Sequence, residues 1–338
     1  MRIAGIAFAW GILSLSLHGQ TPSAIVAPRA DAMNVSPSGQ TASTRAAIAA
    51  AVPVLGYVPG PGPAEIRPIL GAAKKPQLGT PVAAPQGTTR VYLPPRQHYA
   101  LLENSSSQAI LIANTTRAAS TGTRMEASAI PGTIAHPSLI AFSPRGDTAV
   151  LYDQRRNRMQ VIGPLPAGAS VRHEISTANI GEIQELAVSD DGELMVARGS
   201  NGALVTLTHD NSTTWSAPFE PRAWSFVPNR HDLVISVTAQ HALVLLPNVT
   251  EAPRTLATEV EADRLAMTKD GSQLLAAESA TGRVWKIDLQ SGALKQSASA
   301  NADFVSCLRD GLTFLISGGG TFSLLTAAND AITAQLSH

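Results

Sequence analysis

The feature that most constrains the fold is a unit of two short apolar runs joined by a turn, which recurs along most of the chain. The segment "LAMTKDGSQLLAA", starting at Leu265, has Asp-Gly at its turn. Five other segments align with it on that turn. They are "RVYLPPRQHYALL" from Arg90, "IAFSPRGDTAVLY" from Ile140, "LAVSDDGELMVAR" from Leu186, "WSFVPNRHDLVIS" from Trp224 and "VSCLRDGLTFLIS" from Val305. The turn positions are Arg96, Gly146, Gly192, Arg230, Gly271 and Gly311, so the unit repeats roughly every 40–50 residues, the length typical of a propeller blade.

Each unit contains enough short runs for four strands. After the turn comes a second apolar run such as "TAVLY", then a third such as "MQVIG" or "RVWKID", and then a more polar fourth such as "RHEISTA". A repeat of this length that is made only of short strands predicts an all-β fold, a β-propeller with about four strands per blade.

The aligned columns support this arrangement. One column of the first strand holds only small or β-branched residues, as expected where strands crowd around an axis: Val91, Ala141, Ala187, Ser225, Ala266 and Ser306. The next column holds larger apolar groups, which we expect to fill the space between neighbouring sheets: Tyr92, Phe142, Val188, Phe226, Met267 and Cys307. Cys307 is the only cysteine, so no internal disulfide is possible and stability must come from packing.

The number of blades is left open by the segment "VPVLGYVPGPGPAEIRPILG", residues 52–71. Its two apolar runs around a Pro/Gly turn predict a hairpin that resembles the third and fourth strands of a unit. It is either the outer half of a seventh blade or a hairpin beside a six-bladed ring. Because no first and second strands precede it, we favour six four-stranded blades plus an N-terminal hairpin, with seven blades as the alternative.

The N-terminal residues predict export. Residues 1–19 combine a basic start with the charge-free apolar run "IAGIAFAWGILSLSL", which is typical of a signal peptide and shorter than the roughly 20 residues of a membrane span. Residues 20–51 are rich in Ala, Ser, Thr and Pro and predict a flexible leader. We therefore expect a propeller domain at 52–338 in a secreted or periplasmic protein, with no membrane span after removal of the signal.

The units resemble the YVTN/WD-repeat-like propeller superfamily. The resemblance rests on "SPRGDTAVL", "SDDGELMVA" and "VWKIDLQSGAL", which match an "SPDG"-type turn and a third strand followed by its turn. It implies the propeller fold and says little about activity. No unit closes on Trp-Asp or opens on Gly-His, so the hydrogen-bonded His–Asp network of true WD repeats is not expected.

Candidate functional residues lie just before the first strands, where enzymatic propellers usually build their sites around the central channel. Two columns there predict a polar ring at the channel mouth, made of His136, Glu182, Glu220 and Glu261 in one column and Arg222, Asp263 and Asp303 in the other. Several carboxylates in one ring suit a divalent cation or a general acid/base pair. The alternative is a hydrated mouth with no chemistry, because exposed loop positions are polar by default.

A second candidate is the loop between the second and third strands of the unit that starts at Ile140. It holds Arg155, Arg156 and Arg158, which could grip an anion or an acidic partner or simply form a solvated hairpin tip. The chain has no His-Glu-x-x-His, Cys-x-x-Cys, Gly-x-Ser-x-Gly or phosphate-loop motif, so no catalytic residue can be assigned.

Charge and motifs together leave two functional hypotheses. Lys and Arg number 25, as do Asp and Glu, so net charge gives no reason to expect nucleic acid or an anionic membrane as a partner. The favoured hypothesis is an exported non-catalytic propeller that binds a protein partner or serves as a scaffold, without a cofactor. The alternative is a metal-dependent hydrolase or lactonase-like propeller that holds a divalent cation through the channel-mouth carboxylates.

Overall fold

The computed structural model describes residues 52–60, 62, 64–116, 124–202, 204–210, 212–215, 220–249, 251–300, 302–329 and 331–337. They all belong to one compact unit, Ala50–His338. The predicted signal and leader, residues 1–51, lie outside the described residues. No helix in the described part of the chain is long and apolar enough to cross a membrane.

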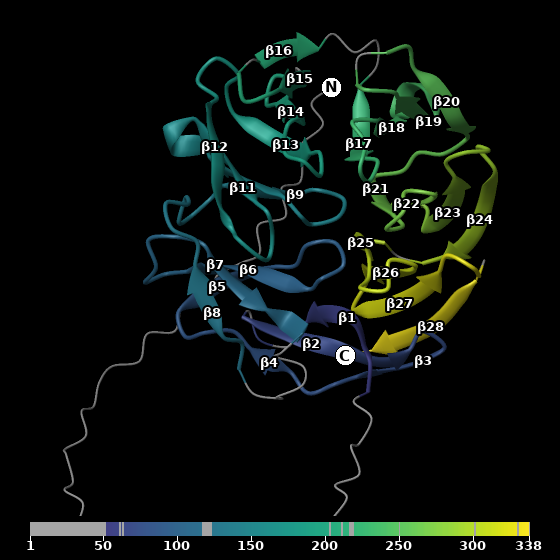
Figure 1. The fold of residues 1–338 in the computed structure, drawn as a ribbon. Coiled ribbons are helices and arrows are strands. Elements are labelled where there is room, and N and C mark those ends of the chain that lie inside the picture. Colours follow the sequence, from purple (N-terminus) through teal and green to yellow (C-terminus); the bar gives the residue numbers. More distant parts are fainter. Residues whose placement is uncertain are drawn as a thin grey trace, which may run out of the picture. The chain divides into compact units, whose positions relative to one another are not determined.

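The described residues form seven four-stranded antiparallel sheets arranged as the blades of a β-propeller (Figure 1). The first sheet contains β1 (Val54–Pro59), β2 (Glu65–Ala72), β3 (Lys75–Leu78) and β4 (Val82–Ala83). The second contains β5 (Thr88–Tyr92), β6 (Tyr99–Asn104), β7 (Leu111–Asn114) and β8 (Ala127–Ala129). The third contains β9 (Leu139–Phe142), β10 (Ala149–Asp153), β11 (Arg158–Gly163) and β12 (Ser170–Ser176).

The remaining four sheets follow in chain order. The fourth contains β13 (Ile183–Val188), β14 (Met195–Gly199), β15 (Leu204–Leu207) and β16 (Ser212–Trp215). The fifth contains β17 (Pro221–Phe226), β18 (Leu233–Val237), β19 (Ala242–Leu246) and β20 (Arg254–Thr258). The sixth contains β21 (Arg264–Met267), β22 (Gln273–Glu278), β23 (Arg283–Asp288) and β24 (Leu294–Ser299). The seventh contains β25 (Phe304–Cys307), β26 (Thr313–Gly318), β27 (Thr321–Thr326) and β28 (Ile332–Ser337).

The core lies between adjacent sheets, as the aligned columns predict. The second strands β10 and β18 are buried at every residue, which explains why they read as continuous apolar runs. Cys307 of the seventh sheet is 4% exposed and packs in one cluster with Leu275 of the sixth. Burial raises the pKa of the Cys307 thiol to about 12, so this cysteine is a packing residue and not a reactive one.

The turns between first and second strands match the repeat alignment, with one correction. Gly146, Gly192, Gly271 and Gly311 all have positive φ, as does Arg96, with φ 65°. In the fifth sheet the positive φ falls on Asn229 (φ 59°) and not on the aligned Arg230. The strands of this turn still follow the alignment, because Phe226 pairs with Leu233 as Met267 pairs with Leu274, and only the left-handed conformation moves, to an asparagine that tolerates it. The correction falls in the second sheet, where Tyr92 pairs with Leu101 and Gln97 N–H donates to Pro94 O as Gly146 N–H donates to Ser143 O. The equivalent of Gly146 there is Gln97 (φ 47°), one residue beyond the aligned Arg96.

The blade number is seven, the alternative that the sequence left open. The hairpin at residues 52–71 forms as β1 and β2, and its sheet is completed by β3 and β4, which follow it in the chain. Both β3 and β4 pair with β2, so this sheet is only three strand positions deep. The hairpin therefore forms the inner strands of its sheet, so the predicted likeness to the third and fourth strands of a unit is wrong.

The ring closes where the first sheet lies between the second and the seventh (Figure 1). Arg96 N–H of the second sheet donates to Cys307 O of the seventh at 3.0 Å, directly across this boundary. Tyr57 O of β1 accepts from Gln97 Nε2 at 3.1 Å, and Leu55 O accepts from Arg309 N–H at 3.1 Å. The three sheets are thus joined by hydrogen bonds between turns and strand ends, and by packing, with no strand shared between them.

We expect a glycine to be needed in the turn between the first and second strands of a blade for two reasons. The turn has a positive φ, and a neighbouring blade packs closely against it. A Cβ at Gly271 (φ 71°) would lie 3.1 Å from Val227 Cγ1 and 3.1 Å from Pro228 Cδ, whereas one at Gly132 (φ 78°) would have no neighbour within 4 Å. We expect Gly132→Ala to lower the free energy of unfolding by about 1 kcal/mol through φ alone, and Gly271→Ala by roughly 1–2 kcal/mol more. Denaturant unfolding of both variants measures the difference, and equal losses would contradict the packing argument.

Candidate functional site

The candidate site is an axial cavity of about 430 Å³. Its walls come from the first strands of the third to sixth sheets, β9, β13, β17 and β21. We call the end of the blades where the chain enters these strands the loop face, and the opposite end the turn face. The lining contains four charged residues, Glu185, Arg222, Asp263 and Arg264, and seven apolar residues, Leu139, Ile140, Ala141, Leu186, Ala223, Trp224 and Leu265.

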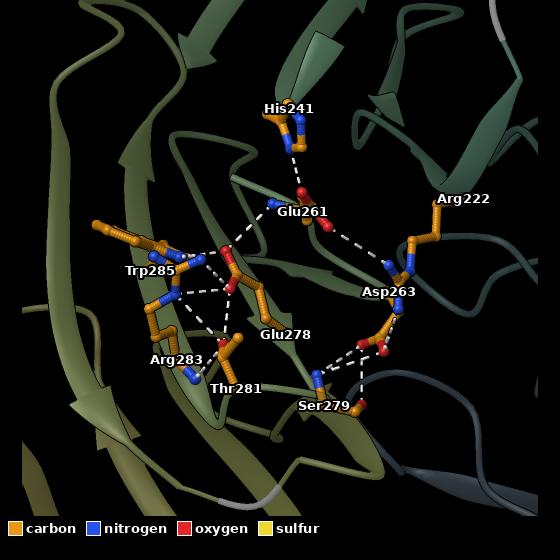
Figure 2. Close-up of polar contacts among 9 residues, drawn as sticks. All are labelled: Arg222, His241, Glu261, Asp263, Glu278, Ser279, Thr281, Arg283 and Trp285. Carbon is orange, nitrogen blue, oxygen red and sulfur yellow. Dashed lines mark hydrogen bonds and ion pairs between the residues drawn. The ribbon is translucent and has the colours of Figure 1, made fainter. Parts of the chain in front are cut away.

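Arg222 lies between two of the predicted carboxylates (Figure 2). Its Nη2 lies 3.5 Å from Asp263 Oδ2, and its Nη1 lies 3.8 Å from Glu261 Oε2. Asp263 also accepts a hydrogen bond from Ser279 N–H at 3.1 Å, and Glu261 pairs with His241 Nδ1. Three of the seven ring residues are therefore brought together, and both carboxylates already have donors.

Behind Glu261 lies a buried carboxylate, Glu278, which is 2% exposed (Figure 2). Its Oε1 accepts from Glu261 N–H at 3.1 Å and from Trp285 Nε1 at 2.9 Å. Its Oε2 accepts from Thr281 Oγ1 and from Arg283 Nε, both at 2.7 Å. Burial disfavours the charged form of Glu278, but these hydrogen bonds outweigh it, so its pKa lies below the ordinary range. Glu278 thus fixes the backbone from which Glu261 projects.

On the fourth sheet the cavity wall carries a second ion pair. Glu185 pairs with Arg198 Nη2, while Arg198 Nη1 donates to Pro221 O at 2.9 Å. The Arg198 guanidinium lies 5.4 Å from the ring centroid of Trp224, within the range of a cation–π contact. Burial raises the pKa of Glu185, although Arg198 and Arg264 act against this. The ion pair holds Trp224 in place beside the cavity.

Arg264 is held differently from the other charged residues of the wall. Its Nε donates to Asp303 O at 2.8 Å and its Nη1 donates to Asp263 O at 2.7 Å. The side chain is exposed at the start of β21, and both of these acceptors are neutral backbone carbonyls. Asp303, a predicted ring residue, thus contributes its carbonyl to Arg264, while its Oδ2 accepts from Gly319 N–H at 3.4 Å.

The other predicted ring residues do not join this cluster. His136 Nδ1 lies 3.0 Å from Glu103 Oε1 of the second sheet. Glu182 and Glu220 are exposed. Within the described residues, no group of three or more His, Cys, Asp and Glu side chains is arranged to hold a metal ion.

The predicted arginine loop is ordered by Asp153, at the end of β10. Asp153 Oδ1 accepts from Arg155 N–H at 3.1 Å and from Arg156 N–H at 3.3 Å, and its Oδ2 lies 3.4 Å from Arg156 Nη1. Arg158 Nη1 turns to Glu174, with both contacts at 3.3 Å. Two of the three guanidinium groups thus face different carboxylates, and anion binding by this loop stays a prediction.

A second hollow, of about 670 Å³, lies on the turn face. Asp190 accepts there from Arg145 N–H at 2.8 Å and from Asn229 N–H at 2.7 Å, and Asp191 Oδ2 lies 2.8 Å from His231 Nε2. These contacts join the turns of the third, fourth and fifth sheets. We therefore assign its aspartates to the contacts between blades.

The residues that sequence reasoning missed lie one position beyond the columns that it used. Extending the alignment back by one residue from the first-strand column gives Thr89, Leu139, Glu185, Ala223, Arg264 and Phe304. Four of these six line the cavity, and Phe304 is 47% exposed. The repeat period could therefore have found Glu185 and Arg264. Nothing in the repeat pattern marks His241 or Glu278 as the partners of Glu261.

Comparison with known proteins supports the fold and leaves the function open. No family model and no curated protein matches this chain, so the resemblance to the YVTN/WD-repeat-like superfamily is not confirmed at the level of sequence. A functionally unknown protein from Desulfotomaculum acetoxidans DSM 771 is 12% identical, with a TM-score of 0.56 over 84% of this chain and 95% of that one. At this identity the likeness concerns the fold alone.

Two further solved structures superpose less closely. Dihydro-heme d1 dehydrogenase NirN, in complex with DHE, is 21% identical with a TM-score of 0.46 over 72% of this chain. The match spans only 53% of NirN, about half its length. Kuenenia stuttgartiensis hydrazine synthase is 12% identical with a TM-score of 0.44, over 71% of this chain and 77% of that one. The seven-bladed architecture rests on the seven sheets of this chain itself, and the candidate site is the axial cavity.

The buried Glu278 should make stability depend on pH. Because its pKa is lower in the folded than in the unfolded chain, its ionised form stabilises the fold above the ordinary pKa of about 4.3, and this stabilisation is lost as the pH falls through the folded value. We expect Glu278→Gln to lower the free energy of unfolding at pH 7 by about 2–4 kcal/mol. Denaturant unfolding between pH 3 and pH 7 should also show a flatter acid limb for the variant than for the wild type. An unchanged acid limb would contradict this role.

The carboxylates of the cavity mouth should not respond to hard cations, because Arg222, His241 and Ser279 already occupy them. We expect Ca²⁺, Mg²⁺ or Mn²⁺ to leave the melting temperature unchanged in both the wild type and Glu261→Ala. A cation present at a hundredfold excess over its Kd would instead stabilise the fold by about 2.7 kcal/mol. A rise in melting temperature that is abolished by Glu261→Ala would support the metal-dependent alternative.

Proposed function

We propose that this protein is an exported, non-catalytic β-propeller that binds a protein partner with its loop face. The observation that carries the proposal is the composition of the axial cavity and its rim. Trp224 and Arg222 line the cavity, and Phe304 stands 47% exposed directly after Asp303, whose carbonyl holds Arg264. Tryptophan and arginine dominate binding hot spots between proteins, and aromatic residues are enriched at interface cores.

The electrostatics of the face support the same function. Arg222 forms ion pairs with both Glu261 and Asp263, Glu261 also contacts His241, and Glu185 is paired with Arg198. Charges that are already paired need little reorganisation when a partner covers them, whereas unpaired charges would oppose burial. The partly exposed apolar residues of the cavity can then supply binding energy. That the protein acts in the cell envelope or the extracellular space is proposed from the predicted signal at residues 1–19.

The alternative of a metal-dependent hydrolase rests on the same carboxylates. Their present contacts are those of an ion-pair cluster, with an arginine where a cation site would need open ligand positions. The protein-binding function therefore accounts for more of the observed contacts.

The proposal can be tested with two exposed apolar residues of the same sheet. Phe304 begins β25 on the loop face, and Leu312, which is 54% exposed, lies in the following turn on the opposite face. We expect Phe304→Ser to abolish capture of partner proteins from the host's envelope fraction, as scored by quantitative cross-linking, and Leu312→Ser to leave it intact. Both variants should keep the wild-type melting temperature. Equal capture by the two variants would refute binding through the loop face.

A further inference from the structure

The starting observation is an arginine in the cavity wall whose hydrogen bonds all go to neutral groups. Arg264 donates to Asp263 O and to Asp303 O, at 2.7 and 2.8 Å. By contrast, Arg222 faces two carboxylates and Arg198 faces one. Within the described residues no carboxylate forms an ion pair with Arg264, so its charge is not neutralised by a direct partner.

The two carbonyls also fix how the Arg264 guanidinium is presented. They belong to residues at the starts of β21 and β25, which are neighbouring first strands, and they hold two of its three nitrogens. A guanidinium carries more N–H donors than these two bonds use, and its planar fork matches a carboxylate. Because the side chain is exposed and already ordered, little conformational entropy would be lost when an anion binds.

The surroundings of Arg264 are apolar. Ile140, Trp224 and Leu265 line the same cavity with partly exposed side chains. The cavity volume of about 430 Å³ falls within the range of roughly 300–1,000 Å³ that is usual for small-ligand sites. The site therefore suits a small group in which a carboxylate adjoins an apolar body, and it is too small for a folded element.

The two carboxylates of the wall have other partners than Arg264. Glu185 pairs with Arg198, and Asp263 accepts from Ser279 N–H and shares Arg222 with Glu261. The charge of Arg264 acts against the rise that burial causes in the pKa of Glu185, but no carboxylate of the described residues forms an ion pair with its guanidinium, so a ligand carboxylate can reach its unused N–H donors.

We propose that the axial cavity binds the C-terminal end of a partner protein, with the terminal carboxylate on Arg264 and an apolar last side chain against Trp224 and Leu265. The C-terminal residue of a chain is the part of a protein that combines these two groups within one residue. This inference rests on the proposed protein-binding function and specifies which part of the partner enters the cavity.

The experiment uses the purified full chain and a library of random hexapeptides that end in Leu, Ile, Val or Phe. Half of the library carries a free C-terminal carboxyl group and half is amidated. We expect the free acids to be retained and their amides to bind at least about tenfold more weakly, because a charge-assisted hydrogen-bonded pair is lost. Arg264→Gln should lose the same factor, and Arg264→Lys should recover part of it.

The matched control is Arg230→Gln, since Arg230 is an exposed arginine on the turn face at the other end of β17. It should bind the free acids like the wild type, and melting temperatures will show whether all the variants are folded. Equal binding of acids and amides, equal binding by Arg264→Gln, or no binding of either library would overturn the inference. The inference would also be overturned if N-acetylleucine displaced the best-binding hexapeptide at an equal concentration. The ligand would then be a free small acid and not the end of a protein chain. In each of these cases the Phe304→Ser result still decides the proposed function separately.

Discussion

Packing between neighbouring sheets is the interaction on which the rest of this structure depends. The chain has one cysteine and therefore no internal disulfide, and within the described residues the strands of different blades form no common ladder, although an isolated bridge joins Ala83 to Arg124. What joins the blades is the burial of apolar residues from both sides, as in the cluster that combines Leu275 with Cys307 and Phe314. The position of the cavity walls follows from this, because the sheets behind the first strands hold these strands around the axis.

The sequence predicted the repeat, the four-stranded units and most of the buried columns, because these features recur and each copy supports the others. Val188, Phe226, Met267 and Cys307 are buried as expected, whereas Tyr92 and Phe142 are only half-buried. The first sheet was harder to interpret because it occurs once and is only three positions deep, so no other unit could be aligned with it. A shift of one residue, from Arg96 to Gln97, also arose in the second sheet, where the turn contains no glycine to mark the position.

The candidate site was predicted less completely, for a physical reason. Position relative to the axis follows the repeat, so the alignment brought Arg222, Glu261 and Asp263 to one region. Which side chains actually meet depends on rotamers and on loops that differ between blades. His136 turned to Glu103, and Asp303 contributed a backbone carbonyl in place of its carboxylate. The polar residues that the sequence placed in one ring thus form separate ion pairs in the structure. The residue with unused hydrogen-bond donors, Arg264, lies one position beyond the predicted ring.

The boundary around the three-position first sheet has a mechanical consequence. Many closed rings gain continuity from a sheet that contains strands from both ends of the chain, whereas here β1–β4 and β25–β28 form separate sheets. The ring is held there by hydrogen bonds between turns and by the Arg309 guanidinium, which lies 5.0 Å from the Tyr57 ring centroid. Side chains and turn atoms therefore make the contacts that close the ring. Single substitutions can strengthen or weaken this closure and leave every β-ladder of the described residues intact.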